Sequence, residues 1–176
     1  DIHFNVLNTN DAPQIDLNID GAFAIEGFLE REHGSHQIKV LDVDIGDTHT
    51  YSIESLKFAA PNGVTSFSYD EWDVVNGISW LYLDTETGLL SGTPDDEDVG
   101  LYEIVFGVED AAGAVSISDP VTLTVNNIND PVYIDDGQTS LFRSEIQNSY
   151  QILISDEDLF DSYTFTATGL PSWMSL

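Results

Sequence analysis

Two stretches of the chain concentrate side-chain oxygen atoms directly after a run of alternating apolar residues. The stretches are NTNDAP and VNNINDPV, and the oxygen-bearing residues that recur between them are Asn8, Asn10 and Asp11, then Asn127, Asn129 and Asp130. Asn, Asp and Pro are frequent in turns, so either stretch alone is typical of a loop. A turn needs no copy far along the chain, however, and this recurrence indicates an array of similar domains.

Two acidic pairs with the pattern Asp-x-Asp also lie in matching contexts, Asp42 with Asp44 and Asp156 with Asp158. On an extended segment both carboxylates of such a pair lie on one face, about 7 Å apart, and a turn of the backbone brings them onto one ion. Calcium takes about six to eight hard oxygen ligands in irregular geometry, whereas zinc prefers His or Cys and magnesium keeps its waters. These residue types therefore favour Ca²⁺ as the cofactor.

The composition narrows the classes of partner. The chain has four Lys and Arg and 32 Asp and Glu, which gives a net charge of −28. This charge argues against nucleic acid and against an anionic membrane surface as binding partners. No apolar run approaches the length of a membrane span, so direct membrane insertion is not expected. With 41% hydrophobic and 11% aromatic residues the chain is too apolar for a disordered acidic tail, and without cysteine it has no disulfide.

The elements that must position these oxygens are strands. Apolar residues alternate in several segments, including 102–108 and 121–125, and turn signals such as APNG, TETG and DAAG lie between them. No sustained helical period is present. Many short strands separated by Gly, Pro, Asn and Asp predict an all-β fold of tandem Greek-key β-sandwich domains.

The repeats predict three parts. Residues 1–10 form the last strand and linker of a preceding domain, residues 11–129 a complete sandwich, and residues 130–176 the N-terminal half of a second one. The first copy carries an insertion within 57–77, and the second stops before the strands that complete the first. A shortened chain, proteolysis and a domain split by an inserted module all remain open.

The segments LDTETGLLSGTP (83–94), VGLYEIVFGVEDAAG (99–113) and GLPSW (169–173) resemble the dystroglycan-type cadherin-like repeat. Repeats of this type are common in large bacterial surface adhesins, including those of the RTX type. The two Asn/Asp stretches resemble the cadherin linker, although its first Asp is Asn here and its final Asn is missing. The resemblance implies an Ig-like or cadherin-like sandwich with calcium at the domain junctions.

The resemblance also implies a ligand set for each junction. For the downstream junction the residues are Glu26, Asp95, Glu97, Asn127, the Ile128 carbonyl, Asn129, Asp130, Asp156 and Asp158. For the upstream junction they are Asn8, Asn10, Asp11, Asp42, Asp44 and Asp110. Asp47 and Asp161 are weaker candidates at equivalent positions, and Asp96 or Asp98 is an alternative to Asp95 or Glu97.

Other polar and aromatic residues have plainer interpretations. Glu30 and Glu32 are expected to be solvated, because they lie too early in the domain for the cadherin acidic motif. Trp80 and Trp173 occupy matching positions, which predicts core packing in both copies. The acidic residues recur between domains and belong to linkers and turns, whereas a catalytic pair occurs once. An enzyme is therefore not expected.

Together these features predict calcium-rigidified spacer domains of an extracellular, cell-surface bacterial adhesin. Their partners are the adjacent cadherin-like domains of the same chain, and a neighbouring module would bind a polysaccharide or protein ligand. The alternative is that the domain itself binds carbohydrate or protein. In that case exposed aromatic residues of the insertion, Phe67, Tyr69 and Trp72, would stack on a sugar ring.

Overall fold

The computed structural model describes residues 3, 7, 9–16, 24–60, 66–70, 78–135, 143–158 and 161–176, without the side chains of 24, 26 and 66–70. The chain forms two compact units, Asp1–Ile128 and Asn129–Leu176. Strands dominate the first unit, two short strands are described in the second, and the helical element of the described residues is one short 3₁₀ turn, η1 (Asp96–Asp98). The predicted all-β fold is confirmed.

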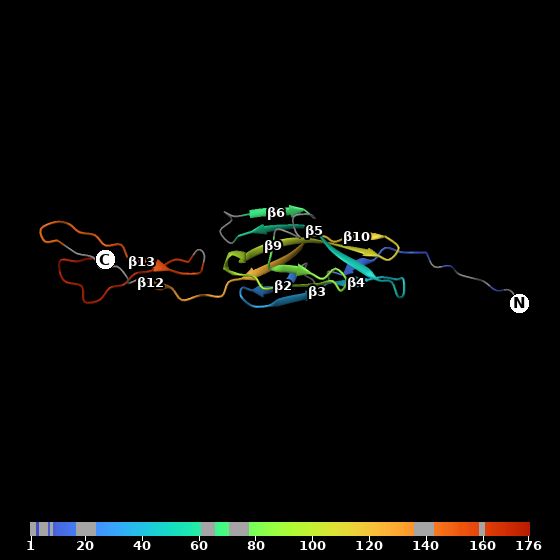
Figure 1. Cartoon of the computed structure of the whole chain (residues 1–176), viewed down its shortest axis with the longest axis horizontal. Helices are drawn as coiled ribbons and strands as arrows, with labels where there is room; N and C mark the ends of the chain where they lie inside the picture. Colours follow the sequence, from blue (N-terminus) through green and yellow to red (C-terminus); the bar gives the residue numbers. More distant parts are fainter. Residues whose placement is uncertain are drawn as a thin grey trace. The chain divides into compact units, whose positions relative to one another are not determined.

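The described part of the first unit contains eleven strands (Figure 1). They are β1 (Gln14–Asp16), β2 (Ala24–Leu29), β3 (Gly34–Gln37), β4 (Lys39–Leu41), β5 (His49–Ala59), β6 (Ser66–Asp70), β7 (Leu81–Leu83), β8 (Leu89–Gly92), β9 (Gly100–Asp110), β10 (Val115–Ile117) and β11 (Val121–Asn126).

A six-stranded sheet in the order β2-β11-β9-β5-β6, with β10 also paired to β9, forms one layer. The strands β3, β8 and β7 form a second sheet, and β1 pairs with β4. All pairs are antiparallel except β2 and β11, which run parallel with a register shift between Leu123 and Val125. The parallel pair places the end of β2 beside the end of β11.

The long strands β5 and β9 form the centre of the six-stranded sheet. Their antiparallel register runs from His49 opposite Asp110 to Ala59 opposite Leu101. Inward-facing residues alternate along β9, so that Tyr102, Ile104, Phe106 and Val108 are all buried. The alternation of inward-facing apolar residues predicted for 102–108 is therefore confirmed.

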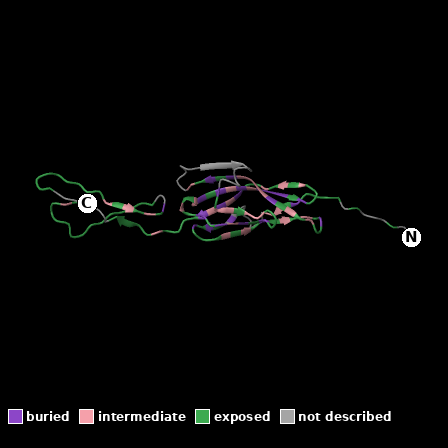
Figure 2. Ribbon diagram, in the orientation of Figure 1, coloured by how far each residue is buried: buried purple, intermediate pink, exposed green. Residues whose placement is uncertain are grey.

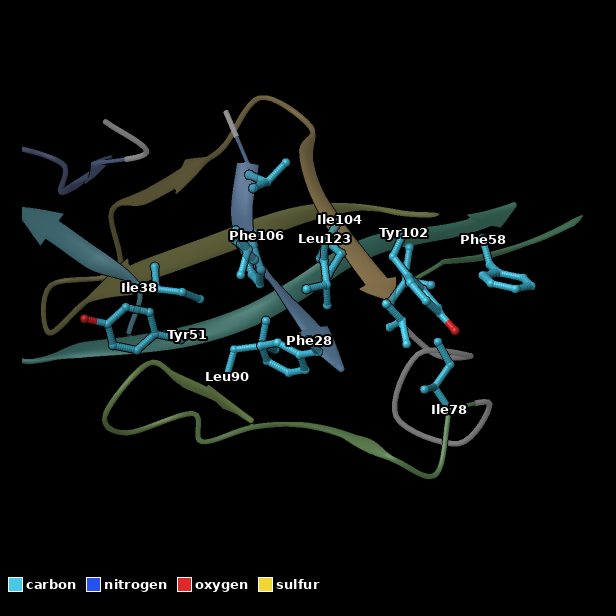
Figure 3. Close-up of a cluster of buried hydrophobic side chains, with 14 of the residues drawn as sticks. Phe28, Ile38, Tyr51, Phe58, Ile78, Leu90, Tyr102, Ile104, Phe106 and Leu123 are labelled. Carbon is cyan, nitrogen blue, oxygen red and sulfur yellow. The ribbon is translucent and has the colours of Figure 1, made fainter. Parts of the chain in front are cut away.

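The core lies between the two sheets of the first unit, where buried residues gather in Figure 2. Leu90 of β8 reaches towards the six-stranded sheet, and Phe28, Leu123 and Ile104 approach from that sheet (Figure 3). Trp80 packs edge-on against Phe28 and Tyr102, with ring centroids 6.3 and 5.4 Å apart. The predicted packing of Trp80 against the core is confirmed.

Close approach of backbone and ring explains one glycine of the β9 strand. Gly100 has φ of +152°, a conformation that L side chains rarely adopt. A Cβ atom at this position would lie 2.6 Å from the Phe58 ring and 2.7 Å from the Ala59 carbonyl oxygen. Glycine at the first residue of β9 therefore lets this strand pair closely with the end of β5.

In the second unit the described strands are β12 (Tyr133–Asp135) and β13 (Leu153–Ser155), which pair antiparallel. Most of the described side chains of this unit are exposed (Figure 2). Trp173 is 69% exposed, so the prediction that it packs in a core like Trp80 is wrong. The strands that Trp80 packs against, β2 and β9, have no counterpart among the described residues of this unit.

The core of the first unit predicts a large cost for truncation of Leu56, which is fully buried on β5 opposite Ile104. Leu56→Ala should lower the free energy of unfolding by about 2–5 kcal/mol, because it removes apolar contacts and leaves a cavity. Urea denaturation followed by circular dichroism measures the change. Ile117→Ala, at a position 62% exposed, is the control and should change stability by less than about 0.5 kcal/mol. Equal effects would contradict this description of the core.

Candidate cation sites

Three carboxylates come together at one end of the first unit, where β4, β5 and β9 meet their turns. Asp42 directly follows β4, Asp47 lies in the turn before β5, and Asp110 is the last residue of β9. One oxygen atom from each lies within 4.8 Å of the others. These residues are called the first acidic cluster, and the geometry suits a single cation bound by several oxygens.

Backbone amides hold these carboxylates in place. The Asp44 amide donates to Asp42 Oδ1 at 2.8 Å, and the amides of Ala112 and Ala114 both donate to Asp110 Oδ1 at 2.9 Å. Asp44 is itself buried, and its Oδ2 accepts from the Asp11 amide at 2.6 Å. Within this Asp-x-Asp pair, Asp42 therefore contributes an oxygen to the first acidic cluster. Asp44 instead holds the segment before β1 (Asn10 and Asp11), which is called the entering segment.

The side chain of Asn10 reaches the same place from the entering segment. Its Nδ2 donates to Asp110 Oδ2 at 2.7 Å. The two ends of an amide group are assigned from the hydrogen bonds that they make, and a half-turn of this amide would exchange the nitrogen for the oxygen. Asn10 and Asp11 therefore lie beside the cluster, as the sequence predicted for the upstream junction.

Two carboxylates of the first cluster, Asp42 and Asp110, have a lowered pKa, which favours their charged form. The backbone hydrogen bond from Asp44 and then the contact with His49 Nε2, at 2.8 Å, lower the pKa of Asp42. The hydrogen bond from Asn10 is the largest cause that lowers the pKa of Asp110. Asp110 is only 5% exposed, so a buried negative charge is retained there, and a bound cation would neutralise it.

The second unit repeats part of this arrangement, because Asp156 and Asp161 stand at positions equivalent to Asp42 and Asp47. One oxygen atom from each of Asp156, Asp158 and Asp161, called the second acidic cluster, lies within 4.8 Å of the others. The Asp158 amide donates to Asp156 Oδ1 at 3.1 Å, and Asp158 Oδ2 accepts from the Asp130 amide at 2.6 Å. Both contacts match those of the first unit residue for residue. Asp47 and Asp161, the weaker candidates, belong to these clusters.

The opposite end of the first unit contains an acidic residue that sequence reasoning assigned to solvent. Glu30 is fully buried, so that interpretation is wrong. Its Oε1 accepts from the Ile128 amide at 2.7 Å, and one of its oxygens lies within 4.8 Å of an Asp96 oxygen. The parallel pairing of β2 with β11 brings Glu30 to the residues after β11, and no local sequence signal shows this pairing.

The predicted acidic pair Asp95 and Glu97 lies on the surface of η1. Asp95 caps this turn, and its amide donates to Asp98 Oδ2 at 2.9 Å. Asp96, an alternative that the sequence left open for this pair, has one oxygen within 4.8 Å of a Glu30 oxygen, and its Oδ2 accepts from Arg31 Nη2 at 2.7 Å.

Other predicted ligands are not gathered into the clusters. Asn127, Ile128 and Asn129 are exposed, and Asn129 Nδ2 donates to the Asp130 carbonyl at 3.0 Å. Asn8 and the side chain of Glu26 lie outside the described residues. The insertion aromatics Phe67, Tyr69 and Trp72 also lack described side chains, so the carbohydrate-binding alternative stays a prediction. Among the described residues, no helix is long and apolar enough to cross a membrane.

These strands and sheets define the first unit as an Ig-like β-sandwich. Residues 34–126 match the model of the He_PIG family, described as "Putative Ig domain". Because this match covers more than half of the chain, the chain belongs to the He_PIG family.

Solved structures with a similar arrangement include two from unrelated sources. The human desmocollin-1 ectodomain shares 16% identity with a TM-score of 0.44, over 84% of this chain and 27% of that chain. A "putative alpha-galactosidase" from Bacteroides fragilis shares 19% identity with a TM-score of 0.42, over 69% of this chain and 19% of that chain. The chain thus spans well under two thirds of either. A comparison with curated protein sequences gave no match.

The lowered pKa of Asp110 predicts a pH dependence of stability. A carboxyl with a lowered folded-state pKa stabilises the fold above its ordinary value, 3.8, and this contribution is lost as pH falls through the lowered value. In chelator, the excess of wild-type Tm over that of Asp110→Asn should therefore be present at pH 5 to 7 and shrink below about pH 4. Asp119→Asn, at an exposed position, is the control. A constant difference down to the acid limit would contradict the assignment.

Proposed function

We propose that the chain binds Ca²⁺ at its acidic clusters and acts as a calcium-rigidified spacer. The observation that carries the proposal is that each unit gathers three carboxylates, two of them at equivalent positions (Asp42 and Asp47, Asp156 and Asp161), beside an Asn-Asp segment whose Asp amide is hydrogen-bonded. Both copies combine an Asp-x-Asp pair, a further Asp three residues later, and an amide of the entering segment bound to the second Asp. If these acidic residues were only solvated surface, nothing would require the same spacing and the same hydrogen bond in both units.

The donor set fits calcium better than other common ions. Every member of the two clusters offers carboxylate oxygens, which are hard ligands. His49 contacts Asp42, but cysteine is absent from the chain, so a zinc site of the usual kind would need ligands from elsewhere. Magnesium demands stricter geometry and keeps several waters, which argues against a protein-only cage.

The physical effect of the cation is to offset repulsion and to fix the entering segment. Oxygens of three charged groups within 4.8 Å of one another repel, and the whole chain carries a net charge of −28. A cation that binds only the folded arrangement adds stability by mass action. Asn10 and Asp11 would then be held against the first unit, and Asp130 against the second, which reduces the freedom of the chain where each unit begins.

The resemblance to the dystroglycan-type cadherin-like repeat of bacterial surface adhesins supports this proposed role. Its motifs in segments 83–94 and 99–113 fall on β7, β8 and β9. A spacer of this kind works at the cell surface, in contact with neighbouring cadherin-like domains of its own chain. It presents a separate module that binds a polysaccharide or protein ligand, and it performs no catalysis of its own.

Calcium should raise the thermal stability of the chain specifically. At about 100 times its Kd, a ligand of the folded state adds about 2.7 kcal/mol, which corresponds to a rise in Tm of several degrees. Scanning calorimetry in chelator, then with calcium, then with magnesium at equal ionic strength, measures the effect. Equal rises with both cations would mean general screening of the acidic chain and would overturn the proposal.

Variants at equivalent positions separate the two clusters. Asp47→Asn and Asp161→Asn each remove one charge from one cluster. Each should reduce the calcium-induced rise in Tm and lower the number of ions bound in equilibrium dialysis. The control Asp119→Asn removes the same charge from an exposed position outside both clusters and should keep the full rise. A loss of calcium response in the control as large as in the variants would count against specific sites.

A further inference from the structure

The polypeptide enters and leaves the first unit at opposite ends of its central strand β9. The entering segment is bound at Asp110, the last residue of β9, by the 2.7 Å hydrogen bond from Asn10 Nδ2. At the exit, Val125 of β11 lies opposite Gly100, the first residue of β9. The strand has 11 residues, which span about 34 Å at the usual rise. Tension along the polypeptide therefore acts along the strands of the first unit.

Between these two ends, the parallel pair of β2 and β11 carries the tension. In the described part of the six-stranded sheet, β2 pairs with β11 alone. Both strands run towards the exit end, and their pairing extends from Ala24 opposite Thr122 to Leu29 opposite Asn126. A pull on the start of β2 and on the end of β11 slides the two strands past each other. Because the hydrogen bonds of a parallel ladder are evenly spaced, they are then loaded together, whereas peeling would load them one after another.

Glu30, whose burial the sequence did not predict, extends this pairing beyond the two strands. Its amide donates to the Asn126 carbonyl at 3.1 Å, and its Oε1 accepts from the Ile128 amide at 2.7 Å. Both hydrogen bonds join the residue that follows β2 to residues at and beyond the end of β11. Glu30 is fully buried, so breaking these bonds leaves buried polar groups unsatisfied, which is costly. Glu30 therefore fastens β11 to β2 where β11 leaves the sheet.

Apolar packing holds the same two strands in the core. Ile25 and Phe28 of β2 are 5% and 3% exposed, and Leu123 and Val125 of β11 are 0% and 1% exposed. All four belong to the core cluster that lies between the two sheets. Sliding β2 along β11 would therefore break core contacts as well as ladder hydrogen bonds.

We infer that the first unit resists tension between its two ends through shear of the β2–β11 pair, which Glu30 fastens. Tension reaches β1 before β2, and β1 has only three residues, which pair with β4. Detachment of β1 should therefore come first, and the β2–β11 pair should set the force at which the unit unfolds. The biological use of this resistance rests on the proposed spacer role, whereas the resistance itself follows from the topology.

The test pulls the intact 176-residue chain in two directions with an optical trap. The chain has no cysteine, so pairs of introduced cysteines define where the DNA handles are attached. Leu7→Cys with Val132→Cys, both at exposed positions, loads β2 and β11 in shear. Glu32→Cys, also exposed, with Val132→Cys pulls on the exit ends of both strands and peels them apart. The main unfolding force should be several-fold higher in the shear direction.

Variants at position 30 test the part that Glu30 plays. Glu30→Ala should lower the unfolding force in the shear direction, whereas Glu30→Gln keeps an oxygen that accepts from the Ile128 amide and should retain most of this force. Leu56→Ala is the control, because Leu56 is buried on β5, outside the β2–β11 pair. It should lower Tm yet leave the force closer to that of the wild type, since forced unfolding depends on the unfolding rate. A force that follows Tm across the three variants would overturn the assignment to Glu30.

Measurements in chelator and in calcium separate this inference from the proposed function. The higher force in the shear direction should persist in chelator, because the β2–β11 pair contains no carboxylate of the two acidic clusters. Calcium should instead raise the force of the earlier step, in which β1 and the entering segment detach. A high shear force with no effect of calcium on that step would support the shear inference and count against the calcium role. Equal forces in the two directions in chelator would overturn the shear inference, whatever calcium does to Tm.

Discussion

The antiparallel pairing of β5 with β9 is the interaction on which the rest of the first unit depends. At one end of the pair, His49 lies opposite Asp110, and the acidic cluster forms where these residues meet the turns. Along its length the pair aligns Leu56 with Ile104, both fully buried. The register shifts by one residue between Ile53 and Ser55, so the cluster and the Leu56–Ile104 pair lie on either side of this irregularity. A further slip of the whole pair by one residue would turn the apolar side chains outward and move Asp110 away from the cluster.

Charge is the constraint that opposes this fold. The chain has only four Lys and Arg residues, and two of them serve local ion pairs, Arg31 with Asp96 and Lys57 with Glu103. Exposed pairs of this kind contribute little to stability. The carboxylates of the first cluster are instead held by backbone amides and by Asn10. Such hydrogen bonds stabilise each charge separately but leave the mutual repulsion, which the proposed Ca²⁺ would offset.

The sequence predicted what depends on short-range pattern and missed what depends on pairing. The alternation of Tyr102 to Val108 and the Asp-x-Asp turns were visible because strands and turns have local signatures. Glu30 was missed because its burial depends on the parallel pairing of β2 with β11, which joins residues far apart in the chain. The prediction that Trp173 packs in a core was wrong for the same reason, because an aromatic residue is buried only when another strand covers it.

The two units together separate local from long-range determinants of the sites. The amide of Asp11 lies 2.6 Å from Asp44 Oδ2, and the amide of Asp130 lies 2.6 Å from Asp158 Oδ2. These equal distances occur although the first unit has a packed core and the described part of the second has mostly exposed side chains. The Asp-x-Asp turn therefore organises its carboxylates without help from a core. The packed strands add a carboxylate from a distant part of the chain, because β9 brings Asp110 to Asp42 and Asp47.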